Sequence, residues 1–541
     1  MGPGLSFITA SGLFLELKSA LESAARNRPE GVWTTFRLIY RLKNRPPLPP
    51  SAYRSESNPG TTLHPFVMKK FSNAYAANKA APSQPGTRRD FFRQAALASA
   101  GLLAAGSGLL SCRPKEARAA ALPAGGGGTV VTRRNIAALA PDDQNVLMLR
   151  EAVRVMKQRS DANQLDPVGW LMNGTLHSLY CATSNYATQV HYSWLFFPWH
   201  RAYLSFLEKQ MQAAINEPGF ALPYWDWTKT RRMPAHYFGQ GNPLHDRTRE
   251  SLLEDEIPAD FIDVGPALRA PRFSSFGGFE KGNPEVPQVE GIVEQSFHNN
   301  VHNWIGGNMG AFPTATLDPI FSGHHGNLDR LWSAWLAYAP AHKNPDDFLW
   351  LNYEFGFYDP KGQLTRIAVK DTLDTESLGY RFDTLDFTQP GPAEMPKRGD
   401  ATAFRRKAPA SAPVEVPGGK RQQVADALAT GRKRVILRFE RMQLTAIPLT
   451  IRVFLDHPGV DARTEPSGSG FVGTFTMLPV GSPEKGLERV VTMQMEVGPE
   501  LAELVRNGKP IAVSLVPVPL RDRRLPTETI QVSGATLVLD E

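Results

Sequence analysis

The chain has 541 residues, of which 42% are apolar and 21% charged, so it can form two globular domains and resembles neither a disordered protein nor a membrane bundle. Its net charge of +7 is concentrated at the N-terminus: residues 1–121 hold 17 Lys and Arg against 6 Asp and Glu, or +11, whereas the remainder holds 43 against 47, or −4. Because the remainder is slightly acidic, nucleic acid is not an expected partner.

Residues 1–121 are predicted to be an N-terminal extension that ends in an export signal. The twin arginine at 88–89 precedes a run, 95–110, that is small and apolar on all sides and too short for a permanent membrane span. This segment resembles a Tat signal, which implies the Tat translocon as a partner and a periplasmic or secreted protein. The signal could be processed in two ways: by cleavage near 117–121, or by lipid attachment at Cys112, whose context resembles a lipobox.

The rest of the chain divides by the period of its apolar residues. Residues 122–345 show mainly helical intervals, including a helix expected over 135–157, and predict a mostly α domain. Residues 391–430 are rich in Pro, Gly and Ala and predict a linker. Short β-branched runs such as RVILRF and IRVFLD in 431–541 predict an antiparallel β-sandwich. The expected fold class is therefore multidomain α+β.

Clustered histidines carry the strongest functional signal. His298 and His302, in FHNNVHNW, are four residues apart and would share one helix face. A second motif holds His191 and His200 around YSWLFFPW, a third is DPIFSGHHGNLDRLW, and His177 begins HSLYC. Any single pair is more often a hydrogen-bonded core pair than a metal site.

Three such motifs, all rich in Trp and Phe, favour metal, because buried imidazoles are costly unless something satisfies them. An all-nitrogen ligand set suits copper, zinc, nickel or iron. The chain has no HExxH glutamate, which argues against a zinc hydrolase.

The runs HYSWLFFPWHRAYLSFLE and DPIFSGHHGNLDR resemble the two copper signatures of tyrosinases, catechol oxidases and plant-type polyphenol oxidases. The resemblance continues through LPYWDW and residues 346–390, a connecting segment expected to pack on the catalytic domain. It implies a four-helix bundle that binds two copper ions as a type 3 dinuclear centre. The implied ligands are His177, His191 and His200 for the first ion and His298, His302 and His325 for the second.

The implied activity is oxidation of phenols and o-diphenols to o-quinones by molecular oxygen, so the expected partners are oxygen and small phenols, with a copper chaperone during export. A reversible oxygen carrier of the haemocyanin kind uses the same copper pair and is the alternative, as is an o-aminophenol oxidase. The oligomeric state is left open.

The resemblance also assigns roles to residues near the ligands. Because HSLYC resembles the plant HCAYC segment, Cys181 is expected to form a thioether with His191. Asp329 would orient a ligand imidazole, or else form an ion pair with Arg201 or Arg330. A further position, Phe312, would stack over the copper pocket or belong to the core.

Two further expectations concern substrate and regulation. Glu294 and Asn299 resemble the pair that holds a water able to accept a phenol proton, which implies hydroxylation of monophenols. Their alternative roles are an acid in a first helical turn and a polar helix residue. The C-terminal domain is expected to shield the copper entrance and keep the enzyme latent until the linker is cut.

Overall fold

The computed structural model describes most of the chain between residues 130 and 539, within one compact unit: 130–182, 188–280, 288–387, 410–443, 449–466, 470–478, 490–518, 532 and 534–539. The described residues do not include the predicted Tat signal, its two possible processing sites or residues 391–409. Among the residues that are described, no helix is both long and apolar enough to cross a membrane.

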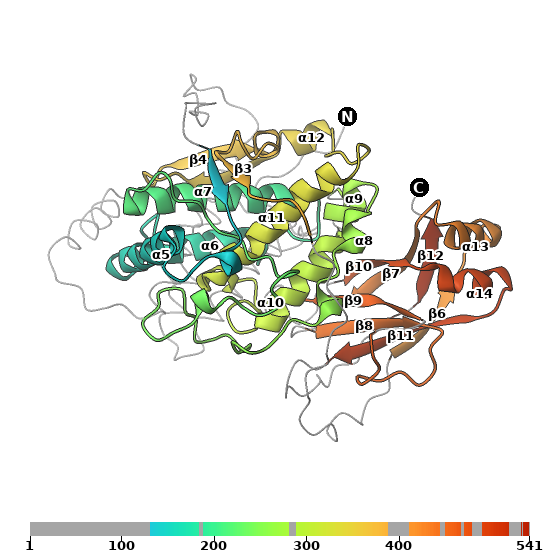
Figure 1. The fold of residues 1–541 in the computed structure, drawn as a ribbon. Helices are drawn as coiled ribbons and strands as arrows, with labels where there is room; N and C mark the ends of the chain where they lie inside the picture. Colours follow the sequence, from blue (N-terminus) through green and yellow to red (C-terminus); the bar gives the residue numbers. More distant parts are fainter. Residues whose placement is uncertain are drawn as a thin grey trace, which may run out of the picture. The chain divides into compact units, whose positions relative to one another are not determined.

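The first part of the described chain is a helical domain (Figure 1). Its long helices are α5 (Gln144–Ala162), α6 (Trp170–Cys181), α7 (Phe196–Ile215) and α11 (Ile320–Tyr338). The shorter ones are α8 (Gly265–Leu268), α9 (Phe273–Gly277), α10 (Asn299–Ile305) and α12 (Phe348–Leu351).

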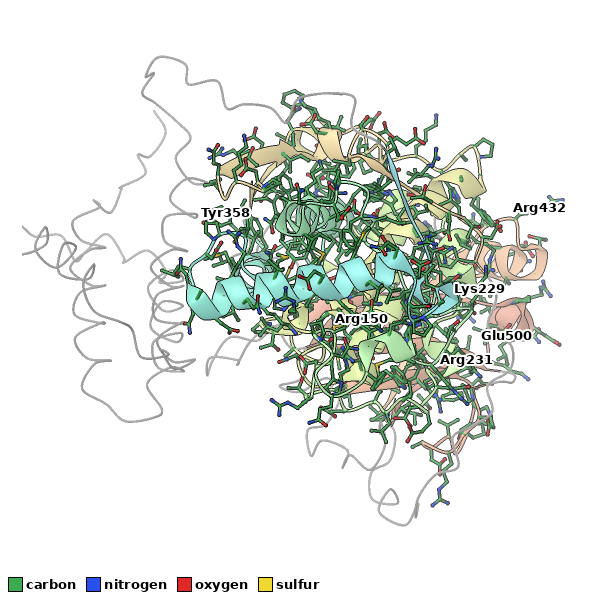
Figure 2. The ribbon with its side chains drawn as sticks, turned by 60° about the vertical axis from the view of Figure 1, so that its left-hand side comes forward. Arg150, Lys229, Arg231, Tyr358, Arg432 and Glu500 are labelled. Carbon is green, nitrogen blue, oxygen red and sulfur yellow. The ribbon has the colours of Figure 1, made fainter. Side chains whose placement is uncertain are left out.

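Helix α5 shows how the local sequence sets an element. The helix expected over 135–157 begins at Gln144, because Asp143 caps it by accepting a hydrogen bond from the Asn145 amide. Most of the apolar positions are buried, but Leu147 is 44% exposed. In Figure 2, α5 crosses the view with the labelled Arg150 on it.

Residues 346–387 pack on the helical domain. They contain the hairpin of β3 (Glu354–Tyr358) with β4 (Leu364–Ala368), and β5 (Tyr380–Phe382), which pairs in parallel with β1 (Val131–Arg133). The Arg201 guanidinium on α7 donates to the Thr372 carbonyl at 3.3 Å. This segment therefore contacts helix α7 of the helical domain.

The C-terminal domain is built on one eight-stranded sheet in the order β2-β10-β7-β12-β6-β11-β8-β9. Its strands are β2 (Gln288–Val289), β6 (Ala410–Glu415), β7 (Val435–Gln443), β8 (Leu449–Leu455), β9 (Phe471–Met477), β10 (Val490–Val497), β11 (Ile511–Val518) and β12 (Ala535–Leu539). Two short helices accompany it, α13 (Arg421–Thr430) and α14 (Ala502–Arg506).

Two expectations about this domain need correction. The sheet is mixed rather than antiparallel, because β12 returns beside β6 in the same direction and β2, from the helical part of the chain, runs parallel to β10. The linker predicted over 391–430 is also too long. Strand β6 and helix α13 lie within it, since the alternating pattern of 410–415 and the small apolar residues of α13 are buried in the domain.

Candidate metal centre

Helices α6 and α7 and the segment between them bring the histidines of the first group together. His177 lies on α6, His200 on α7, and His191 in the segment between them, with Cys181 at the end of α6. All four side chains are buried, and their potential ligand atoms lie within 4.8 Å of one another. The three predicted ligands of the first site are therefore in one place.

The second group combines helix α10 and helix α11. His298 ends a π-helical turn, Glu294–His298, that leads into α10, and His302 lies one turn further on. His324 and His325 come from α11, and the potential ligand atoms of all four imidazoles again lie within 4.8 Å. The two groups adjoin, because the ring centroids of His200 and His325 are 4.4 Å apart.

Hydrogen bonds tie the Nδ1 atoms of four imidazoles to fixed acceptors. Carbonyl oxygens accept from His177 (Phe312, 3.0 Å), His200 (Phe196, 2.8 Å) and His302 (Met309, 2.7 Å), and the Asn299 amide oxygen accepts from His298 at 2.8 Å. A carbonyl cannot donate, so each Nδ1 carries the proton and each Nε2 keeps its lone pair. This is the state in which a ring can bind a metal ion through Nε2.

The fifth imidazole, His191, is oriented by a carboxylate. Its Nδ1 lies 2.7 Å from Oε1 of Glu294, which also accepts from the backbone amide of Tyr192. Tyr192 adopts a positive φ of 59°, an uncommon conformation for a residue with a side chain. The turn at Tyr192 therefore brings the Glu294 carboxylate against the ring, and strained backbone of this kind clusters at functional sites.

The structure distinguishes the adjacent histidines His324 and His325. The indole N–H of Trp227 donates to Nδ1 of His324 at 3.2 Å, so in the neutral ring Nε2 of His324 must carry the proton. His325 instead directs Nε2 to within 3.1 Å of Nε2 of His302. Two nitrogens about 2 Å from one tetrahedral ion are separated by about 3.3 Å, so His302 and His325 fit a shared ion.

The imidazole nitrogens of the two groups fit a bound metal ion better than a network of ion pairs. Burial lowers the pKa of every imidazole in the two groups, to about 3 for His191 and His302, so the rings are neutral near pH 7. The Nε2 atoms of His191 and His298 are buried without any hydrogen-bond partner. Unsatisfied buried lone pairs that face one another are what a bound cation would satisfy.

Aromatic rings wall the centre. Phe312 lies with its ring centroid 4.3 Å from that of His191, and Phe321 lies 4.0 Å from His325 in a stacked arrangement. The Phe312 backbone also orients His177, so one residue contacts the centre through both its ring and its carbonyl. Both contacts place Phe312 against the imidazoles of the first group.

Asp329 does not contact a ligand imidazole in the structure. Its carboxylate accepts from Arg201 at 2.5 Å, from Arg133 at 3.3 Å and from the Tyr380 hydroxyl. The alternative of an ion pair with Arg201 is therefore the correct one, although the pair is buried in the core and not on the surface. One of these partners, Arg201, is the neighbour of His200 on α7.

Glu294 and Asn299, the predicted pair, make different direct hydrogen bonds. Glu294 is engaged by His191 and Tyr192, whereas the Asn299 amide nitrogen lies 3.4 Å from Oε1 of Glu290. The second carboxylate oxygen of Glu290 is buried without a hydrogen-bond partner. Burial and the Glu294 carboxylate raise the pKa of Glu290 well above its usual value. Sequence reasoning missed Glu290, whose only signal was an acid four residues before Glu294.

Cys181 is buried beside the first group as a free cysteine. Its Sγ lies 4.0 Å from Nε2 of His200. Burial, and after it the Glu294 carboxylate, raises the pKa of this thiol well above its usual value, so the sulfur keeps its proton. The thiol is therefore close to the ligand rings without being a thiolate ligand.

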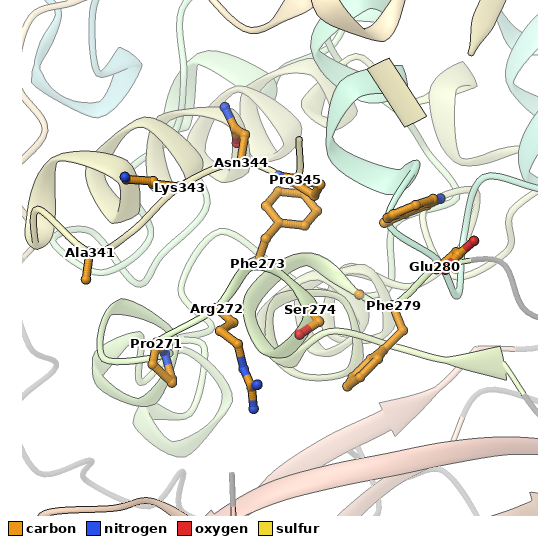
Figure 3. A pocket seen from close by; sticks show the side chains of 12 residues that line it. Pro271, Arg272, Phe273, Ser274, Phe279, Glu280, Ala341, Lys343, Asn344 and Pro345 are labelled. Carbon is orange, nitrogen blue, oxygen red and sulfur yellow. The ribbon is translucent and has the colours of Figure 1, made fainter. Parts of the chain in front are cut away.

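A separate pocket of about 420 Å³ lies away from these histidines (Figure 3). Aromatic and charged side chains line it, among them Trp194, Phe273, Phe279, Arg272 and Lys343. None of the six predicted ligands belongs to its lining, so this pocket is not the metal centre.

The fold and the site define a protein with two adjacent, buried, all-imidazole metal sites on helices. The "common central domain of tyrosinase" matches residues 168–261 and 257–338, and the "polyphenol oxidase middle domain" matches 343–390. Residues 168–338 therefore carry a tyrosinase central domain and residues 343–390 a polyphenol oxidase middle domain, and proteins of this type bind two copper ions.

Curated relatives extend the match beyond these domains. The latent form of polyphenol oxidase from Prunus armeniaca is 27% identical over 72% of this chain and 73% of its own length. Polyphenol oxidase E of Solanum lycopersicum and catechol oxidase B of Solanum tuberosum are each 33% identical, and the chain spans about half of their length, 47%. All three relatives are described as chloroplastic.

Solved structures agree with the fold. A latent aurone synthase, itself a polyphenol oxidase, is 26% identical with a TM-score of 0.60 and covers 77% of this chain and 90% of its own. Latent apple tyrosinase, at 23% identity and a TM-score of 0.59, covers 76% of this chain and 97% of its own and shares the fold. A helical core followed by a C-terminal domain is thus common to all three chains.

Proposed function

We propose that this chain is a copper-dependent oxidase that converts phenols and o-diphenols to o-quinones with molecular oxygen. The observation that carries the proposal is the pair of buried imidazole groups: Nδ1 of five of the six proposed ligands faces a hydrogen-bond acceptor, and the potential ligand atoms of each group lie within 4.8 Å of one another. The ligands would be His177, His191 and His200 for one ion, and His298, His302 and His325 for the other.

Bound copper would supply oxygen binding and electron exchange with the phenol. The chain's own contribution is to hold five of the six neutral imidazoles in one orientation through second-layer acceptors such as Glu294 and the Phe312 carbonyl. The aromatic wall, with Phe312 and Phe321, excludes water and offers a flat apolar surface to a phenol ring.

Turnover separates this function from its alternatives. Copper-loaded protein should convert a catechol to quinone continuously, measured as quinone absorbance, with o-aminophenol as a parallel substrate. Reversible oxygen binding without quinone would indicate a carrier of the haemocyanin kind. Faster oxidation of o-aminophenol than of any catechol would indicate the other oxidase.

We further propose hydroxylation of monophenols, with a buried carboxylate and the Asn299 amide holding a water that accepts the phenol proton. The geometry favours Glu290 as the carboxylate partner of Asn299, because Glu294 is engaged by His191. A phenol has a pKa near 10, so its proton needs such an acceptor near pH 7.

Substitutions test this assignment through a ratio of rates. Glu290→Gln and Asn299→Gly should lower the monophenol rate, relative to the catechol rate, by about tenfold or more, since general-base catalysis contributes about 100-fold or more. Glu294→Gln should slow both substrates together, because Glu294 orients His191. Rates are normalised to bound copper. If all three variants lose both activities equally, proton acceptance by these residues is wrong.

We propose that Cys181 forms a thioether with His191, supported by its burial in the same group as that ring. Loss of a thiol hydrogen and a ring hydrogen, with copper and oxygen as the oxidant, would join sulfur to the imidazole carbon and stiffen a ligand. Copper-loaded protein should then be lighter by two hydrogens than protein expressed without copper, and only the latter should alkylate at Cys181 in denaturant. Alkylation of both preparations would exclude the bond.

We propose that residues 88–112 direct export through Tat, supported by the twin arginine before an apolar run. Replacing Arg88 and Arg89 by lysine should leave the protein in the compartment where it is made, whereas replacing Lys69 and Lys70 by arginine should not. Fractionation with immunodetection measures this. Export of the Arg88→Lys, Arg89→Lys variant would contradict the route, and membrane retention that depends on Cys112 would favour the lipid anchor.

A further inference from the structure

Strands β8 and β9 present a polar face that is buried. Thr450 pairs with Thr476 and Arg452 with Thr474 across the two strands, and alternation puts these four side chains on one face. Such a polar face usually meets solvent. Here the four residues are only 0–3% exposed, so they need partners within the protein.

The side-chain partners of Thr450 and Thr476 are on α10, the helix that carries His302. Figure 1 shows α10 beside β8 and β9. The Asn303 amide donates to the Thr450 hydroxyl at 2.8 Å, the two threonine hydroxyls lie 2.6 Å apart, and Thr476 donates to the Asn300 amide oxygen at 2.7 Å. This chain of hydrogen bonds begins and ends on α10. Strands β8 and β9 therefore bind the side of α10 that faces away from His298 and His302.

A fourth contact reaches a ligand directly. The backbone carbonyl of Thr476 accepts from the Asn299 amide nitrogen at 2.9 Å, while the Asn299 amide oxygen accepts from Nδ1 of His298 at 2.8 Å. Because a carbonyl can only accept, Thr476 decides which way the Asn299 amide points. The amide oxygen in turn keeps the proton of His298 on Nδ1 and its Nε2 free.

An ion pair adds to this attachment. Arg452 reaches the Asp260 carboxylate of the helical domain at 3.0 Å, and Thr474 donates to the same carboxylate at 2.6 Å. Both partners of the ion pair are buried, with side chains 2% and 4% exposed. Breaking a buried ion pair of this kind costs free energy. The pair therefore keeps strands β8 and β9 fixed against the residues around α10.

We infer that strands β8 and β9 are positioning elements of the second copper site, with Thr450 and Thr476 as the positioning residues. They hold α10 and set the orientation of His298 through Asn299. The C-terminal domain therefore helps to retain copper, in addition to any effect on the access of substrate to the copper centre. The inference rests on the proposed function only for the identity of the metal.

The experiment uses the full-length, copper-loaded chain and the double variant Thr450→Val, Thr476→Val. Valine keeps the branched shape and strand preference of threonine but removes the hydroxyls that Asn300 and Asn303 use. Copper release to an excess of chelator should show one of the two ions leaving about fivefold faster or more, the factor that one lost hydrogen bond corresponds to. The other ion should leave at the unmodified rate.

Two control variants and one further test variant make the outcome specific. Thr536→Val on β12 should leave both release rates unchanged. Added to His325→Ala, which retains only the first site, the two Thr→Val changes should have no effect. Asn299→Asp, which keeps the oxygen that faces His298 but loses the N–H donor to Thr476, should speed release of the same ion as the double variant.

Unchanged release in the double variant and in Asn299→Asp would overturn the inference. Equal acceleration of both ions would also overturn it, since that result indicates general loosening of the fold. A quinone assay on the same samples keeps the two proposals apart. Two tightly held copper ions without turnover would contradict only the oxidase, and equal release with full turnover would contradict only the positioning role.

Discussion

Replacing His325 by alanine should leave one copper ion per chain instead of two and reduce catechol oxidation by roughly a thousandfold or more, the effect of losing about 4 kcal/mol of transition-state stabilisation. The reason is that Nε2 of His325 faces Nε2 of His302 at 3.1 Å, as two ligands of one ion would. Metal analysis and quinone absorbance measure the two effects.

His324→Ala is the matched control. It removes the neighbouring imidazole from the same buried group, but that ring is bound to the Trp227 indole through Nδ1. The variant should keep two copper ions and lose only stability, by about 1–3 kcal/mol for the unsatisfied indole N–H. If His324→Ala loses a copper ion and His325→Ala does not, the assignment of the sixth ligand is reversed.

Cutting the chain between residues 391 and 409 and removing the C-terminal domain should raise catechol oxidation about tenfold or more, if the domain covers the entrance in at least about nine molecules of ten. The domain reaches the centre, because the Tyr192 hydroxyl, next to His191, donates to the Leu478 carbonyl at 3.2 Å. A specific protease site introduced in this segment allows the cut to be timed.

The positioning role of β9 adds a second effect of the cut. Once Thr476 is removed, the Asn299 amide loses its partner, so the activated enzyme should release one copper ion faster than the intact chain. The uncut chain with the inserted site is the control. Unchanged turnover after the two parts have been separated would show that the domain does not make the enzyme latent.

The spacing of residues along the sequence predicted those parts of the site that are set by residues close together in the chain. The four-residue interval of His298 and His302 does place both rings together, with centroids 4.5 Å apart. The two histidine runs carried the family resemblance, which the domain matches confirm. Spacing alone could not separate His324 from His325, since the difference depends on Trp227, which is 97 residues away.

Other features depend on contacts that no local pattern encodes. Asp329 follows the histidine pair in sequence, but its carboxylate lies in a buried cluster with Arg133 and Arg201. The short β-branched runs predicted strands in this domain correctly, yet not that the polar face of β8 and β9 would be buried against α10. The parallel pairing of β12 with β6 likewise depends on where the last strand returns.

The most direct measurement is a crystal structure of the copper-loaded chain with anomalous diffraction at the copper absorption edge. Two anomalous peaks per chain are expected. One should be bound by His177, His191 and His200 and the other by His298, His302 and His325. A single peak, two peaks that use His324 in place of His325, or copper bound only outside these two groups would contradict this assignment.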